Sequence, residues 1–150
     1  VLHSDLDDRA VMSAAISLWL PPEQGRVIVV TPTTPYRLRA WHHEVEPPSE
    51  TFVHFAERNG APVDISDMEL LLAHPAEMMS AEDAETVRVT YNDIRYAFQV
   101  SLPGYSCVAD EALVYVVADC GNLCAFGMVV HVVKADGIWL PAQWEMQWIS

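Results

Sequence analysis

The sequence predicts an α+β fold in which N-terminal helices pack on an antiparallel sheet that ends in a C-terminal β-meander. Three observations predict it. Helical patterns fall in the first 85 residues, β-branched and aromatic runs fill the rest, and Asp136-Gly137 separates the last two apolar runs. Helices followed by hairpin-linked strands are typical of helices packed on one face of a sheet. At 150 residues we expect one domain, residues 1–150, with its own core.

The first predicted helix spans residues 5–20. Acidic side chains lie in its first turn, where the helix dipole favours negative charge. Its predicted apolar face, which recurs at helical spacing, consists of Leu6, Ala10, Ala14 with Val11, and Leu18. Pro21-Pro22 is expected to end it. The β-branched run at residues 26–31 then predicts a buried strand.

Three shorter helical segments are predicted in the middle of the chain. The first covers residues 51–59, with Asn59-Gly60 as its end. The second covers residues 65–72. The third is a single turn over residues 80–85 that Ser80 caps.

From residue 87 onward the pattern predicts strands, at residues 87–91, 96–102, 113–117, 128–134 and 138–149. The third and fourth of these are apolar on both parities, which is typical of strands covered on both faces. In the last strand, alternate residues from Ile138 to Trp148 are apolar, which predicts that Trp144 and Trp148 lie in the core. Pro141 favours an edge strand or a bulge there.

The charge balance excludes several classes of function. Asp and Glu number 21 against 8 Lys and Arg, a net charge of −13. A nucleic-acid-binding surface needs clustered cations, so we expect no nucleic-acid partner. The longest apolar runs are far shorter than the roughly 20 residues that span a bilayer, so we expect no membrane span. The partner that we still expect is an unknown protein or small ligand, and the sequence does not determine the oligomeric state.

Cys120 and Cys124 flank a three-residue bend between two predicted strands. They form a structural disulfide, remain as reduced thiols, or act as a redox or metal-binding pair. Redox motifs usually separate the cysteines by two residues and place one at a helix N-terminus, so the disulfide is favoured. Cys107 is then the unpaired thiol. A disulfide favours a periplasmic or extracellular location, with the cytoplasm as the alternative.

Other candidate chemistry is sparse. His42-His43-Glu44-x-Glu46 contains metal-ligand residue types, but adjacent histidines on a strand point to opposite faces, which favours a solvated loop over a metal site. His131, on an apolar strand, is interpreted as a hydrogen-bonded histidine of the core or edge. The chain lacks a Gly-x-Ser-x-Gly elbow, a phosphate loop and a dinucleotide fingerprint. We therefore assign no catalytic residue, metal ligand or cofactor.

Several short motifs lie in the C-terminal half and in one upstream segment, at residues 55–59, 101–106, 112–116, 120–127, 136–139 and 148–150. Together these segments, about half the chain, resemble a family of small uncharacterised bacterial α+β proteins, many of them exported. The family pattern is an upstream F-x-x-x-N element, then S-R-x-G-F/Y-S, A-L-V-Y-V, C-G-x-L-C-G-x-G, D-G-x-W and a final W-V-S. This chain has Leu102 where the family has Arg, and Ala125 where it has Gly. The resemblance implies the fold and export, and it supplies no established activity.

Two function hypotheses follow. The first is a non-enzymatic exported domain that binds a protein or small ligand in the bacterial envelope, including an inhibitor-type role toward a basic partner. The second is a small enzyme whose pocket on the sheet is assembled from scattered His, Tyr and carboxylate side chains. A deep pocket holding groups of perturbed pKa would favour the enzyme.

Overall fold

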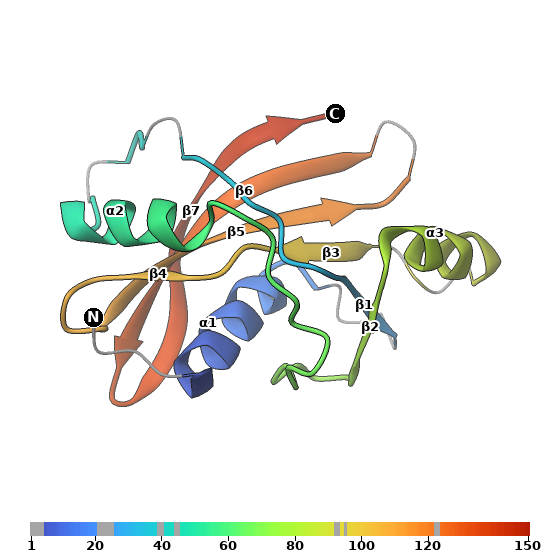
Figure 1. The fold of residues 1–150 in the computed structure, drawn as a ribbon, viewed down its shortest axis with the longest axis horizontal. Coiled ribbons are helices and arrows are strands. Elements are labelled where there is room, and N and C mark those ends of the chain that lie inside the picture. Colours follow the sequence, from blue (N-terminus) through green and yellow to red (C-terminus); the bar gives the residue numbers. More distant parts are fainter. Residues whose placement is uncertain are drawn as a thin grey trace.

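The computed structural model describes residues 5–20, 26–38, 41–43, 46–91, 94, 96–121 and 124–150. In this part of the chain three helices flank one seven-stranded sheet (Figure 1). The helices are α1 (Asp5–Ser17), α2 (Ser49–Arg58) and α3 (Ala81–Thr90). The strands are β1 (Val27–Val30), β2 (Ala76–Met79), β3 (Ala97–Val100), β4 (Gly104–Tyr105), β5 (Glu111–Asp119), β6 (Ala125–Ala135) and β7 (Ile138–Ile149). No helix among these residues has the length and hydropathy needed to cross a membrane.

The sheet is mixed, so the prediction of a purely antiparallel sheet is wrong. The strand order is β2-β1-β3-β5-β6-β7. Strands β3 and β4 both pair with the same side of β5, β4 with residues 112–113 and β3 with residues 116–119. Strand β1 runs parallel to both β2 and β3, while the remaining pairs are antiparallel. Parallel neighbours need long crossover connections. The segments that carry α2 and α3 provide them, between β1 and β2 and between β2 and β3.

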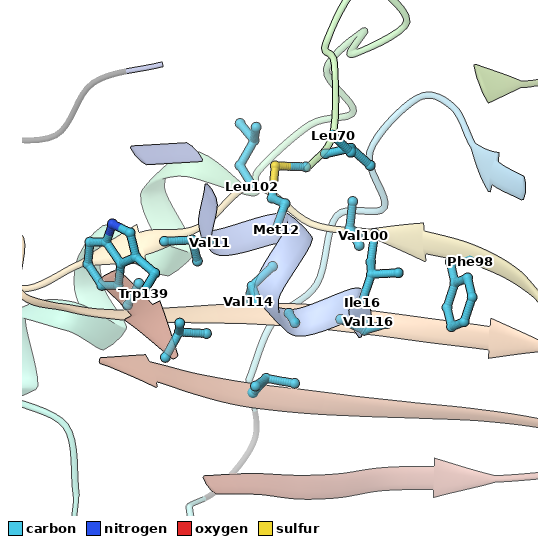
Figure 2. Close-up of a cluster of buried hydrophobic side chains, with 14 of the residues drawn as sticks. Val11, Met12, Ile16, Leu70, Phe98, Val100, Leu102, Val114, Val116 and Trp139 are labelled. Carbon is cyan, nitrogen blue, oxygen red and sulfur yellow. The ribbon is translucent and has the colours of Figure 1, made fainter. Parts of the chain in front are cut away.

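Helices cover both faces of the sheet, where the sequence predicted one. Val11, Met12 and Ile16 of α1 are fully buried against side chains such as Val114 and Val116 of β5 (Figure 2). Residues of the opposite parity on β5 pack against Phe55 of α2 instead. Helix α3 lies over β1 at the far end of the sheet from α2 (Figure 1). A strand apolar on both parities is covered on both sides, which explains the pattern of β5.

The C-terminal meander of β5, β6 and β7 is present. Asp136 and Gly137 form the β6–β7 turn with φ of 51° and 77°, as a two-residue hairpin loop with left-handed central residues requires. Cys120 and Cys124 lie at the other end of β6. Both connections between these strands were predicted from the sequence.

The predicted burial of the last strand is wrong. Trp144 and Trp148 are 43% and 37% exposed, whereas Trp139, of the other parity, is 7% exposed. Two irregularities in the β6–β7 register, at Gly127/Met128 and His131/Val132, each add one residue to β7. A bulge reverses which face the following side chains occupy, so Trp139 and Trp144 both contact the α1 side, and the edge position of β7 leaves Trp144 partly exposed.

Two predictions of secondary structure in the middle of the chain are also wrong. Residues 87–91 were predicted as a strand, but 87–90 belong to α3 and Tyr91 caps it. Ser80 caps this helix as predicted, because its Oγ accepts a hydrogen bond from the Asp83 amide (3.2 Å). Residues 65–72 contain no helix; they form a turn and then an extended segment on α1.

The first helix is present, but its buried face differs from the predicted one. The fully buried side chains are Val11, Met12, Ala15 and Ile16, while Ala10, Ala14 and Leu18 pack only partly against the core. The side chain of Leu6 and the Pro21-Pro22 stop lie outside the described residues. The helix itself ends at Ser17.

Candidate ligand-binding site

A buried ionic network joins α1 to α2 around the free side of β4. Both guanidinium Nη atoms of Arg58 donate to the carboxylate of Asp8, over 2.8 and 2.9 Å, and Nη1 also donates to the Pro103 carbonyl (2.8 Å). The Tyr105 hydroxyl donates to the same carboxylate (2.7 Å). Burial, and then the negative charge of Asp8, raise the pKa of Tyr105, so its phenol stays protonated. A carboxylate buried this deeply needs such partners to offset the cost of removing it from water.

The end of α2 is fixed to the chain that enters β4. The Asn59 side-chain amide donates to the carbonyls of Phe55 (2.9 Å) and Leu102 (2.8 Å), and its oxygen accepts from the Leu102 amide (2.9 Å). A Cβ at Gly104 would lie 2.3 Å from the Phe55 Cα, so only glycine permits this approach. The predicted end of this helix at Asn59 is correct, and these side-chain bonds provide its physical reason.

A cavity of about 550 Å³ opens beside this network. We call it the edge cavity. Its walls come from α1, from α2 and from the extended segment that follows α2. The lining residues are Asp8, Arg9, Arg58, Val63, Asp64, Ile65, Asp67, Met68, Glu69 and Leu102. Ligand sites in proteins are typically 300–1,000 Å³ with a mostly apolar wall and a few polar groups. The edge cavity falls within this size range, and its wall combines four apolar side chains with six charged ones.

The outer wall of the edge cavity is held at both ends. The backbone of Val63 bonds to Thr33 in both directions, over 2.9 Å to its amide and 2.8 Å to its hydroxyl. At the other end the Leu71 amide donates to the Ser13 Oγ (2.7 Å) on α1. The wall is therefore part of the fold.

Arg9 differs from the other charged groups of the edge cavity. Its Nε is buried and has no hydrogen-bond partner, and in the described part of the chain its guanidinium forms no ion pair. Arg58, by contrast, is neutralised by Asp8. Asp64 accepts from the amide (2.9 Å) and hydroxyl (2.6 Å) of Ser66, and these bonds lower its pKa. Asp67 and Glu69 are exposed at the rim.

A second polar cluster lies on the α2 side of the sheet. Residues 31–38 and 41–43 cross this face, and the Tyr36 hydroxyl donates to the Gln147 Oε1 (2.6 Å) on β7. The His42 amide donates to the Glu145 Oε1 (2.7 Å), and the His42 Nδ1 lies 2.5 Å from the same atom. The Glu145 Oε2 is buried without a partner. The His42 side chain is 79% exposed, so this pair is open to solvent.

His131 is a buried histidine, one of the two positions predicted for it. Its Nε2 lies 3.0 Å from the Glu111 Oε1, and its Nδ1 lies 3.1 Å from the Gln143 Nε2. Burial lowers the pKa of His131, against the opposing effect of Glu111. Both ring nitrogens are therefore engaged within the fold.

The other predicted candidates fall in different places. His43 bonds through Nε2 to the Trp144 carbonyl (2.7 Å), while Glu44 lies outside the described residues. Where the chain is described, no three His, Cys, Asp or Glu side chains gather as a metal site would require. The Cys120 and Cys124 sulfurs lie at bonding distance with their Cα atoms 5.2 Å apart, and Cys107 is free and exposed. None of these residues lines the edge cavity.

The residues that carry the family resemblance have structural partners here. The Ser101 Oγ accepts from the Tyr115 amide (2.9 Å), and Gly104 allows α2 to approach. Tyr105 bonds into the ionic network, and the Ser106 Oγ holds the turn before β5. Comparison with protein-family models, curated proteins and solved structures returns no match for this chain.

Sequence reasoning named Tyr105 among aromatic residues that could line a ligand groove, but it did not single out Asp8, Arg9 or Arg58 as site residues. The pair Asp8 and Arg58 is separated by 50 positions, so no local spacing connects the two. One indication was available: only eight Lys and Arg occur, and Arg9 stands directly before the apolar run of the first helix. Leu102, where the chain departs from the family pattern, also lines the edge cavity.

Proposed function

We propose that this protein is a non-catalytic binding domain of the bacterial envelope that holds a small ligand in the edge cavity. The observation that carries the proposal is a fixed cavity of about 550 Å³ whose partly apolar wall includes an unpaired guanidinium. A net charge of −13 makes a nucleic-acid ligand unfavourable.

The chemistry of the wall favours binding over catalysis. The described lining residues include no serine, threonine, cysteine or histidine that would serve as a nucleophile or neutral base. The Asp8 carboxylate is held by Arg58 and Tyr105, and the raised pKa of Tyr105 keeps its proton in place. The polar groups of Asp8 and Tyr105 are thus occupied by hydrogen bonds within the fold.

A thermal-shift screen of small metabolites tests this proposal. Val63→Trp would fill the mouth of the edge cavity from a position that is already 39% exposed. Val53→Trp, on the exposed side of α2 and outside the cavity lining, is the matched control. A true ligand at 100 times its Kd stabilises the protein by about 2.7 kcal/mol. It should do so in the wild type and Val53→Trp but not in Val63→Trp, and an equal shift in all three would reject the cavity.

The envelope location rests on the cysteine pair, for which we propose an architectural role. Protein recovered from an oxidising compartment should weigh about 2 Da less than the fully reduced chain, because one S–S bond forms with loss of two hydrogens. The bond closes a short loop and should contribute on the order of 2 kcal/mol. A mass that fits three free thiols would remove the argument for export.

One observation favours a second candidate, a small enzyme. A buried carboxylate, Glu145, holds the exposed imidazole of His42 through Nδ1, which is the arrangement that orients a general base. Turnover of a chromogenic ester or phosphoester that His42→Ala abolishes, and His43→Ala does not, would support it. No turnover, or turnover that survives in His42→Ala, would end this candidate.

A further inference from the structure

We infer that the edge cavity takes a small monocarboxylate with an apolar body, and that Arg9 binds the carboxylate. This inference rests on the proposed binding function and names the chemical class of the ligand. The starting observation is the Arg9 guanidinium, which lines the edge cavity and forms no ion pair among the described residues, and whose Nε is also buried without a hydrogen-bond partner. Buried polar groups are almost always satisfied, so a guanidinium without an acceptor beside a cavity marks a place where one can bind.

The acceptor that fits a guanidinium best is a carboxylate. Its two oxygens match two parallel N–H donors, and the charge strengthens both hydrogen bonds. The same wall already contains this geometry once, because Arg58 holds Asp8 through two bonds of 2.8 and 2.9 Å. Arg9 presents the same chemistry with no carboxylate opposite.

The remaining charges around Arg9 limit the ligand to one negative charge. Asp8 is neutralised by Arg58 of α2, and Asp64 is turned toward Ser66 in its own loop. Asp67 and Glu69 keep their charges at the solvent-exposed rim. A second carboxylate on the ligand would meet these like charges, since one unpaired cation serves the whole cavity.

The apolar part of the wall determines the rest of the ligand. Ile65 and Leu102 are buried at 4% and 8% exposure, and Val63 and Met68 complete the apolar lining. An alkyl or aryl group of a few carbons would exclude water from these side chains. An ion such as phosphate or sulfate would leave these apolar side chains in contact with water. Its larger negative charge would also be repelled by the carboxylates at the rim.

Three probes of equal length separate the contributions of charge and apolar body: hexanoate, hexanamide and adipate. Binding to the folded protein is measured by NMR titration or calorimetry. Hexanoate should bind the wild type at least tenfold more tightly than the neutral amide or the dicarboxylate. Arg9→Gln should weaken hexanoate at least tenfold, and Arg9→Lys should weaken it less because the charge remains. Arg37→Gln, which removes an exposed arginine outside the cavity lining, should change nothing.

The outcomes distinguish this inference from the proposed function. Equal affinity for hexanoate and hexanamide, equal affinity in Arg9→Gln, or no binding by any monocarboxylate from butanoate to octanoate overturns the carboxylate inference. If another compound then binds and Val63→Trp blocks it, the binding function stands without the inference. Hexanoate binding that needs Arg9 but survives in Val63→Trp would overturn both, because the ligand would lie outside the cavity. Thermal unfolding of each variant confirms that it is folded before titration.

Discussion

Replacing Arg58 with methionine should be among the most destabilising single changes in this chain. The substitution keeps the apolar stem of the side chain but leaves the Asp8 carboxylate buried without its cation. Three hydrogen bonds are lost, two to Asp8 and one to the Pro103 carbonyl. Removing one partner of a buried ion pair costs about 3–5 kcal/mol, far more than an exposed pair would. In a domain of this size that corresponds to a fall in Tm of roughly 6–20 °C.

The assay is urea unfolding followed by tryptophan fluorescence, with a double-mutant cycle that adds Asp8→Asn. The doubly substituted protein has no unpaired buried charge, so it should recover part of the stability that Arg58→Met loses. The interaction free energy from the cycle should lie within the 0.5–3 kcal/mol seen for contacting pairs. A cost below about 1 kcal/mol for Arg58→Met, or strict additivity, would refute the reasoning that this pair holds α1 and α2 together.

Two further predictions concern the sheet. Gly127→Ala should lower the free energy of unfolding in urea by about 1–3 kcal/mol. The added Cβ would lie 2.2 Å from the Trp148 Nε1 and 2.5 Å from the Tyr115 hydroxyl, which are hydrogen-bonded to each other. Gly60→Ala is the control because its Cβ meets nothing within 4 Å, and equal stability of the two variants would contradict the packing argument. Because the folded protein lowers the pKa of His131 below the unfolded value of about 6.5, the unfolded state binds more protons there, and stability should fall as the pH drops from about 6.5 toward the lowered pKa. His131→Gln should flatten that part of the stability curve, and an unchanged pH dependence would show that His131 does not contribute.

Much of the C-terminal half was predictable because its information is local. The Asp136-Gly137 pair specifies a hairpin turn by itself, and continuous apolar runs mark the central strands β5 and β6. The burial pattern of β7 was not predictable, because each bulge depends on how β6 pairs with it. The extra residue between Trp139 and Trp144 lets both side chains contact the face that α1 covers, although they have opposite parity.

In the N-terminal half, less of the structure was predictable from local sequence. The alternation of Val87 and Val89 with polar residues is typical of a strand, yet the Ser80 cap begins a helix that continues through it and leaves Val89 exposed. The parallel strand β2 escaped prediction because its four residues, Ala76–Met79, have no strong strand propensity. Its pairing with β1 makes the sheet mixed. The edge cavity likewise depends on segments that only tertiary structure brings together.

The ion pair of Asp8 and Arg58 affects how the protein unfolds locally. Helices α1 and α2 lie on opposite faces of the sheet, so local fluctuations would ordinarily release each one separately. The shared bidentate pair makes these events interdependent, because the release of either helix breaks the same two hydrogen bonds. The slowest-exchanging amides of both helices should therefore show one common opening free energy, and the two layers should unfold as a single cooperative unit.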